Sequence, residues 1–375
     1  MNRGKFWILS IAGMALATSC STEVELNAPY DSKTVVYGLL EASADTQFFR
    51  INKTFLGDGN NLDYAQIRDS SEYDPSELYV RVEQWVDGDL QNTFDVNPIE
   101  RSDKETDGIF FAPEYTAYYF PTPDGLDDES TYRLLIDFSN GEEPVRAETD
   151  MVESLSGNSN ITRPPSNNPA FRLILATAQT PLTGVYPEFR FKWNTTPGAG
   201  RYDAVLRMHY IERLWQDTEH TILLSETPKV FEWNIGTFQT KSLLGGEEFE
   251  AITSGETFFR LVGASMQANP LITRQIGTVS GQNNPTFDFI LSVANGELDT
   301  YMEVNSPVTG IIQERPTYTN IVNGLGVFAS KATQGVYGFQ PHEETIRELW
   351  SGAYTSSLNF CSPDPLFEFE GFYCE

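Results

Sequence analysis

The sequence predicts a mostly β protein, built from tandem β-sandwiches and a mixed C-terminal region. Short runs of β-branched and aromatic residues recur along the chain, and polar residues alternate with apolar ones inside them. This alternation is typical of strands with one buried face. Dipeptides such as Asp87-Gly88 and Asn140-Gly141 stand between the runs and favour tight hairpins. With 375 residues, 21 Pro and 28 Gly, the composition indicates two or three turn-rich domains of roughly 100–200 residues each.

Residues 1–19 have the pattern of a bacterial export signal. Two bases precede an apolar run from Phe6 to Leu16, and small residues then lead to Cys20. The run is shorter than the roughly 20 residues that a membrane-spanning helix needs. The stretch resembles a lipobox, which implies cleavage before Cys20, lipidation of its thiol and a lipidated tether over residues 20–31. An ordinary secretion signal followed by a chance cysteine is the alternative.

Residues 32–153 are expected to form the N-terminal β-sandwich domain. The runs at 33–41 and 46–55 flank a short polar turn and predict a hairpin. A second hairpin is expected over 77–96, and the polar stretch between the two hairpins leaves room for a short helix near 62–68. Two later aromatic-rich runs continue the same pattern and supply the remaining strands.

A stretch rich in Ser, Asn and Pro at residues 154–169 predicts a linker. Residues 170–295 then predict a second β domain. Aromatic residues alternate along a strand that ends in Trp193, and a Pro-Gly turn leads to a strand that opens with Tyr202. This arrangement resembles fibronectin type III domains and implies immunoglobulin/fibronectin-like sandwiches. Later apolar runs in this domain supply further strands or an inserted helix.

Residues 296–375 are expected to combine short helices with a disulfide-closed tail. Helical periodicity is clearest at 295–305 and 342–354. With one cysteine assigned to lipid, Cys361 and Cys374 remain, and an even remainder in an exported protein indicates a disulfide. Two free thiols are the alternative.

The chain is strongly acidic, with a net charge of −28. Removal of the two bases in residues 1–19 makes the mature chain more acidic still. Such a surface repels phosphate backbones, which argues against nucleic-acid binding. It also argues against a body that lies flat on an anionic membrane, and it suits a soluble body held off the membrane by a tether.

No catalytic residue, metal site or cofactor is predicted. The three histidines are scattered and lack metal-ligand spacing; they are His209, His220 and His342. A phosphate loop at residues 323–328 would need a following lysine that is missing. We expect a turn there instead, with positive φ at Gly324 and Gly326.

Acid-rich segments offer oxygen ligands for calcium but match no known calcium loop. The segments are residues 102–108 and 124–130, and we expect both to be solvated loops. The 53 acids make some carboxylate pair inevitable, so such pairs carry no weight for glycoside hydrolysis. Trp215 and Trp350 are the tryptophans whose exposure tests for a sugar platform.

Three features together resemble one family of uncharacterised bacterial lipoproteins. They are "TVVYGLLEASADTQFFRINKTFLGDGN" after the lipobox, "YTNIVNGLGVFAS" late in the chain, and a tail that carries cysteines. The family is a domain-of-unknown-function group of Bacteroidota, often encoded beside TonB-dependent receptors. Its tail carries a denser cysteine cluster than the two residues present here.

The resemblance implies an outer-membrane lipoprotein that works with a transporter or envelope complex. We therefore expect a lipid-anchored, non-catalytic binding or accessory subunit, with a TonB-dependent receptor or another outer-membrane protein as partner. A surface carbohydrate-active enzyme on a β-scaffold is one alternative. A structural or adhesion module of the envelope is another.

Overall fold

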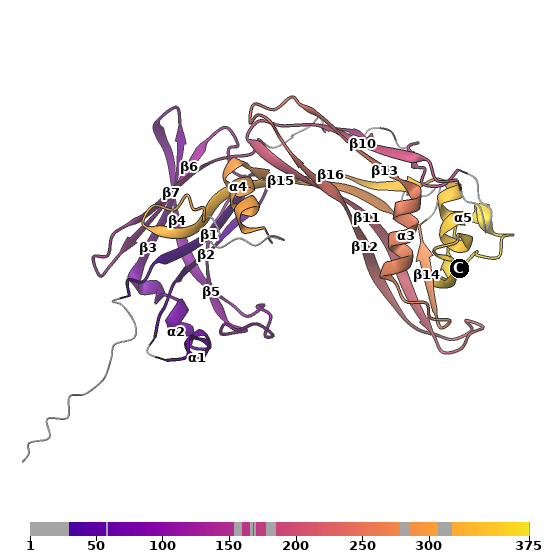
Figure 1. Cartoon of the computed structure of the whole chain (residues 1–375), viewed down its shortest axis with the longest axis horizontal. Coiled ribbons are helices and arrows are strands. Elements are labelled where there is room, and N and C mark those ends of the chain that lie inside the picture. Colours follow the sequence, from indigo (N-terminus) through magenta and orange to yellow (C-terminus); the bar gives the residue numbers. More distant parts are fainter. Residues whose placement is uncertain are drawn as a thin grey trace, which may run out of the picture.

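The computed structural model describes residues 30–57, 59–153, 160–165, 168, 170–177, 185–277, 286–306 and 317–374. The signal sequence, Cys20 and most of the expected tether lie outside the described residues. Two lobes lie side by side, and both consist mainly of strands (Figure 1). The prediction of a mostly β fold is therefore confirmed. The two lobes share a large mixed sheet, and the second lobe also contains a three-stranded sheet, which together give a β-sandwich-like architecture.

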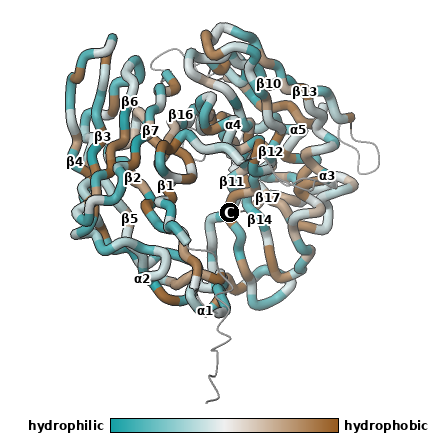
Figure 2. Tube along the Cα trace, turned by 60° about the vertical axis from the view of Figure 1, so that its left-hand side comes forward, coloured by the Kyte–Doolittle hydropathy of each residue, from teal (hydrophilic) through white to brown (hydrophobic). Residues whose placement is uncertain are grey.

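The N-terminal lobe follows the predicted hairpins closely. Its strands and helices are β1 (Thr34–Glu41), β2 (Thr46–Lys53), α1 (Asn61–Ala65), α2 (Arg68–Ser71), the 3-10 helix η1 (Pro75–Glu77), β3 (Leu78–Val86), β4 (Asp89–Arg101), β5 (Tyr115–Pro121), β6 (Thr131–Phe138) and β7 (Val145–Asp150). Asp87 and Gly88 both have positive φ in the β3–β4 turn, as a tight hairpin requires. Buried and more exposed residues alternate along β1 and β6, and Figure 2 shows hydrophilic and hydrophobic residues interspersed along the strands of this lobe.

The N-terminal lobe closes because strand β4 pairs with a different neighbour at each of its ends. The first part of β4 pairs with β3, and its last residues pair with β5. On the far side, the backbones of Arg146 in β7 and Val322 form an isolated bridge. The enclosed core is aromatic and aliphatic, and it includes Val36, Phe120 and Leu134, each with no exposed surface.

The second lobe packs two layers of strands against each other. Its elements are β8 (Ile161–Arg163), β9 (Arg172–Leu173), β10 (Glu188–Asn194), β11 (Ala199–Trp215), β12 (Leu223–Gln239), β13 (Glu248–Ser254), α3 (Gly255–Ser265), β14 (Ile272–Ile276), β15 (Phe287–Asn295), α4 (Gly296–Asn305), α5 (Glu343–Ser351), η2 (Ser356–Leu358), β17 (Phe360–Cys361) and η3 (Pro365–Phe367). The small sheet has the order β13-β10-β8, while β11 belongs to the large sheet. The rings of Trp193 and Tyr202 therefore meet across the layers in the core, and their centres are 6.1 Å apart.

Strand β16 (Gly324–Pro341) joins the two lobes (Figure 1). Its first half runs parallel to β1 of the N-terminal lobe, and its second half runs antiparallel to β15 of the second lobe. Phe328 is accordingly part of the N-terminal core, and Phe339 is part of the other core. The arrangement differs from a linear series of domains, because each lobe uses residues from the expected C-terminal region.

Other parts of the expected layout also take different roles. Strand β8 lies within the stretch expected to be a linker, and it pairs with β10. The expected helices at the C-terminal side are present as α4 and α5. Cys361 and Cys374 form a disulfide, and the tail between them packs Phe367 and Phe372 into the second core.

The expected glycine turn is wrong in two details. Asn323 and Gly326 have positive φ, whereas Gly324 does not. Gly326 also lies inside β16 rather than in a turn. A Cβ atom there would stand 2.0 Å from the carbonyl oxygen of Val36, so the glycine permits the close approach of β16 to β1.

Candidate functional site

The strongest candidate site is a groove on the N-terminal lobe, which we call the outer groove. Two adjoining cavities of about 630 and 710 Å³ form it, and they share Tyr37, Arg50 and Tyr115. The groove lies on the face of strands β16, β1, β2, β5 and β4 that points away from the lobe's core. Cavities of this size are typical of sites for small molecules.

Strand alternation places the groove residues. In β1, Val36 and Leu40 point into the core, so Tyr37 points outward. In β2, Phe49 points inward, so Phe48 and Arg50 point to the groove. The side chains of Tyr37 and Phe48 remain 46% and 44% exposed. Large aromatic side chains thus line the groove without being buried by the fold.

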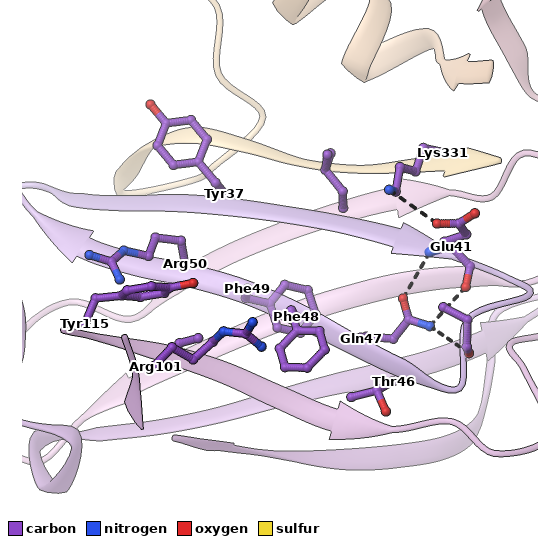
Figure 3. A pocket seen from close by; sticks show the side chains of 13 residues that line it. Tyr37, Glu41, Thr46, Gln47, Phe48, Phe49, Arg50, Arg101, Tyr115 and Lys331 are labelled. Atoms are coloured by element: carbon purple, nitrogen blue, oxygen red, sulfur yellow. Dashed lines mark hydrogen bonds and ion pairs between the residues drawn. The ribbon is translucent and has the colours of Figure 1, made fainter. Parts of the chain in front are cut away.

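Cations and aromatic rings contact one another along the groove. The Arg50 guanidinium lies 4.3 Å from the ring centre of Tyr115, and that of Arg101 lies 5.4 Å from the ring centre of Phe48. Figure 3 shows these pairs, with the ion pair between Lys331 and Glu41 farther along. Cation–π contacts of this kind hold side chains in place while their remaining faces stay open to a ligand.

The charge of the groove is opposite to that of the molecule. Among the residues that the structure describes, five cations and a single carboxylate line its two cavities. The cations are Arg50, Lys53, Arg101, Lys104 and Lys331, and the carboxylate is Glu41. Arg50, Arg101 and Lys331 form ion pairs with Glu72, Asp103 and Glu41. In a chain of net charge −28, the positive charge that favours an anionic ligand over a cationic one therefore comes mainly from Lys53 and Lys104.

Glu72 fixes Arg50 from the side of the protein. Its carboxylate accepts hydrogen bonds from Arg50 at 2.8 Å, from Arg68 at 2.9 Å and from the Thr116 amide at 3.1 Å. Burial alone would raise the pKa of Glu72, but the bonds from Arg68 and Thr116 and the charge of Arg50 outweigh burial and lower it. Glu72 therefore stays ionised and keeps Arg50 in place.

Helix α4 contacts Tyr37, one of the residues that line the groove. Tyr301 of this helix meets Tyr37 edge to face, with ring centres 6.2 Å apart. The two hydroxyl groups are 3.4 Å apart. Burial, followed by the hydrogen bond with Tyr37, raises the pKa of Tyr301 to about 12. Tyr301 is thus a neutral aromatic group at ordinary pH.

A second, smaller cavity of about 320 Å³ is acidic and lies where the two lobes meet. Its carboxylates are Asp128, Glu129, Asp150, Glu153 and Glu297. Burial, with a smaller effect of neighbouring carboxylates, raises the pKa values of Glu153 and Glu297. No aromatic or basic side chain is among the described residues that line this cavity.

The three histidines have separate partners. His209 pairs with Asp288 at 2.6 Å, His220 contacts the carbonyl of Pro270, and His342 caps α5. Among the described residues, no three His, Cys, Asp or Glu side chains are grouped so that they could hold a metal. The cysteine pair forms the disulfide described above, and Cys20 lies outside the described residues.

The structure also shows where the two tryptophans proposed as sugar platforms and one of the acid-rich segments lie. Trp215 donates a hydrogen bond to Thr273 at 2.8 Å, and Trp350 stacks on Phe372. Both rings are partly buried, so neither is an open platform. Segment 102–108 lies in the loop after β4 and contributes Lys104 to the outer groove.

Sequence reasoning missed the outer groove. Its signal is present, because Tyr37, Phe48 and Arg50 occupy outward positions of predicted strands. Which outward positions meet depends on the order of strands in the sheet. That order requires the structure.

Comparison with curated proteins found no match. Among solved structures, the C-terminal globular domain of an oligosaccharyltransferase from Pyrococcus abyssi matches at 12% identity with a TM-score of 0.16. That match covers 60% of this chain and 37% of the other chain. A likeness this weak carries no argument about fold or function.

None of the helices within the described residues is long and apolar enough to cross a membrane.

One family model matches most of the chain. The model covers residues 21–334, which include the groove strands and most of β16. The chain therefore belongs to the family described as domain of unknown function (DUF4249).

Proposed function

We propose that this protein is a lipid-anchored, non-catalytic binding subunit of an envelope complex at the outer membrane. The outer groove is the observation that carries the proposal, because it offers exposed aromatic and basic side chains on a preformed sheet. Residues 1–20 support the anchor, and the resemblance stated above supports a TonB-dependent receptor or another outer-membrane protein as partner.

Binding is favoured over hydrolysis by what lines the groove. A glycoside hydrolase needs two carboxyl groups roughly 5–10 Å apart around the scissile bond. Among the described residues that line the groove, Glu41 is the single carboxylate, and it pairs with Lys331 at 3.3 Å. The acidic cavity has carboxyl groups with raised pKa values, but its described lining offers no aromatic surface for a sugar.

Exchange of the groove's aromatic residues tests the binding role. The protein is purified from its natural host under mild conditions, and native mass spectrometry measures any co-purified small molecule. We expect a bound molecule on the wild type and its loss in the variant Tyr37→Ala/Phe48→Ala. Tyr79→Ala, which removes an exposed tyrosine elsewhere on the lobe, is the matched control. Equal occupancy in the groove variant and the wild type would contradict the proposal.

The anchor is tested separately by Cys20→Ser. Serine offers no thiol for lipidation, so the variant is expected to leave the membrane fraction for the soluble fraction. Cross-linking of the anchored wild type is expected to recover an outer-membrane partner. Retention of Cys20→Ser in the membrane pellet, or failure to recover an envelope protein with the wild type, would contradict the anchored-subunit role.

A further inference from the structure

Basic and apolar residues line the larger cavity of the outer groove. Its volume is about 710 Å³, and its described lining includes Arg50, Lys53 and Lys104 and no carboxylate. We call this part the basic end. We propose that the basic end binds an amphipathic anion, meaning an apolar or aromatic body that carries one carboxylate, sulfonate or phosphate group. This inference rests on the proposed binding function and specifies its ligand class.

Lys104 is the cation best placed to receive an anion. Its ammonium group donates to the carbonyl oxygen of Phe111 at 2.6 Å and lies 5.7 Å from the ring centre of Phe110. Burial and the charge of Arg50 lower the pKa of Lys104. An anion placed between Lys104 and Arg50 would counter both effects, because it neutralises charge that the protein holds in a half-buried site.

The other two cations are held from outside the cavity. Arg50 uses the buried carboxylate of Glu72 and keeps one face against the ring of Tyr115. Lys53 lies 5.2 Å from the ring centre of Tyr73 and borders a neighbouring pocket that contains Glu72, Glu77 and Glu100. The carboxylates near these cations therefore face the neighbouring pocket rather than the basic end.

Apolar groups complete the cavity. Its lining includes Val35, Phe55 and Phe110 together with the rings of Tyr37 and Tyr115. Phe110 is 46% exposed although it lies beside a cavity wall. An apolar body that covers these surfaces would gain roughly 25 cal/mol for each Å² removed from water. A bare inorganic anion would leave them uncovered.

The loop that carries Lys104 and Phe110 is anchored to the lobe. The Phe111 amide donates to the Ala65 carbonyl of α1 at 2.8 Å, and the Gln66 side chain donates to the carbonyl of Ile109. The cations thus stand in place before a ligand arrives, which reduces the ordering cost of binding. A free small molecule is a better ligand than an anionic bilayer, because the protein's net charge of −28 opposes its approach to an anionic bilayer.

Calorimetric titration of the full-length protein with a matched pair of probes tests this inference. The probes are 2-naphthoate and its neutral analogue 2-naphthamide. We expect naphthoate to bind about 10-fold more tightly than naphthamide, as one charge-assisted hydrogen bond implies. Lys104→Gln should reduce that ratio to about 3-fold or less, whereas Phe110→Ala should weaken both probes alike. Lys229→Gln, an exposed lysine on β12, should leave the ratio unchanged.

The outcomes separate the two proposals. Equal affinity for both probes in the wild type would overturn the anion inference and leave the groove as a binding site. Failure of both probes to bind would contradict the groove itself. Circular dichroism checks that each variant is folded, and Lys53→Gln supplies a second charge variant if Lys104→Gln does not fold. An unchanged ratio in every folded charge variant would also overturn the inference.

Discussion

Glu72 is a carboxylate with only 7% of its surface exposed, and two arginines and a backbone amide depend on it. Removing one partner from a buried ion network leaves the others uncompensated, so Glu72→Gln should lower the free energy of unfolding by about 3 kcal/mol at pH 7. Urea titration measures this. The control is Glu100→Gln, because Glu100 contacts Arg68 with a 61% exposed side chain; its cost should stay within about 1 kcal/mol.

The same residue predicts a pH dependence with a definite sign. The pKa of Glu72 in the folded state lies below its ordinary value of 4.5, so the unfolded state binds the proton more readily. Its stabilising contribution is therefore complete above pH 4.5 and is lost as the pH falls through the lowered pKa. The difference in stability between wild type and Glu72→Gln should shrink over that acidic range. A difference that stays constant from pH 7 to below the lowered pKa would contradict this assignment.

At the scale of elements, the parallel seam between β1 and β16 depends on one glycine. Gly326 has a φ of +100° and faces the backbone of Val36. Gly326→Ala should destabilise the protein by about 2 kcal/mol or more, because it combines an unfavourable φ with a backbone clash. Gly108→Ala is the control, since a Cβ there meets nothing within 4 Å, and it should be neutral or stabilise by up to about 1 kcal/mol. Thermal unfolding of both variants measures the contrast, and equal effects would contradict it.

Elements with local signals could be predicted from the sequence, and elements that depend on distant partners could not. The β3–β4 hairpin follows from Asp87-Gly88 and alternating residues, and α5 follows from apolar residues at helical spacing. The parallel pairing of β1 with β16 joins opposite ends of the chain, and no local pattern marks it. The groove residues were identifiable as outward-facing, but their meeting depends on the strand order.

For the whole molecule, the acidic composition and the basic groove are complementary. A surface with a net charge of −28 repels anionic polymers and bilayers over several ångströms. A small anion carries few charges, so this repulsion is weaker for it than for a polymer or a bilayer. It can therefore still reach the cations within the outer groove. The overall charge thus favours small ligands over large ones at the same site, without any lid or gate.

The two lobes should unfold as one unit. Strand β16 completes both cores, and Ser330 in this strand bonds the Val152 amide and the Asp150 carbonyl, which lie at the end of the N-terminal lobe. Calorimetry of the oxidised protein should therefore show one transition. Phe328→Ala and Phe339→Ala lie in different cores, yet both should lower the same midpoint, each by the equivalent of about 3 kcal/mol or more. Tyr337→Ala, on the same strand but 61% exposed, should change it little. Two transitions, each shifted by only one of the phenylalanine variants, would show that the lobes unfold independently despite the shared strand.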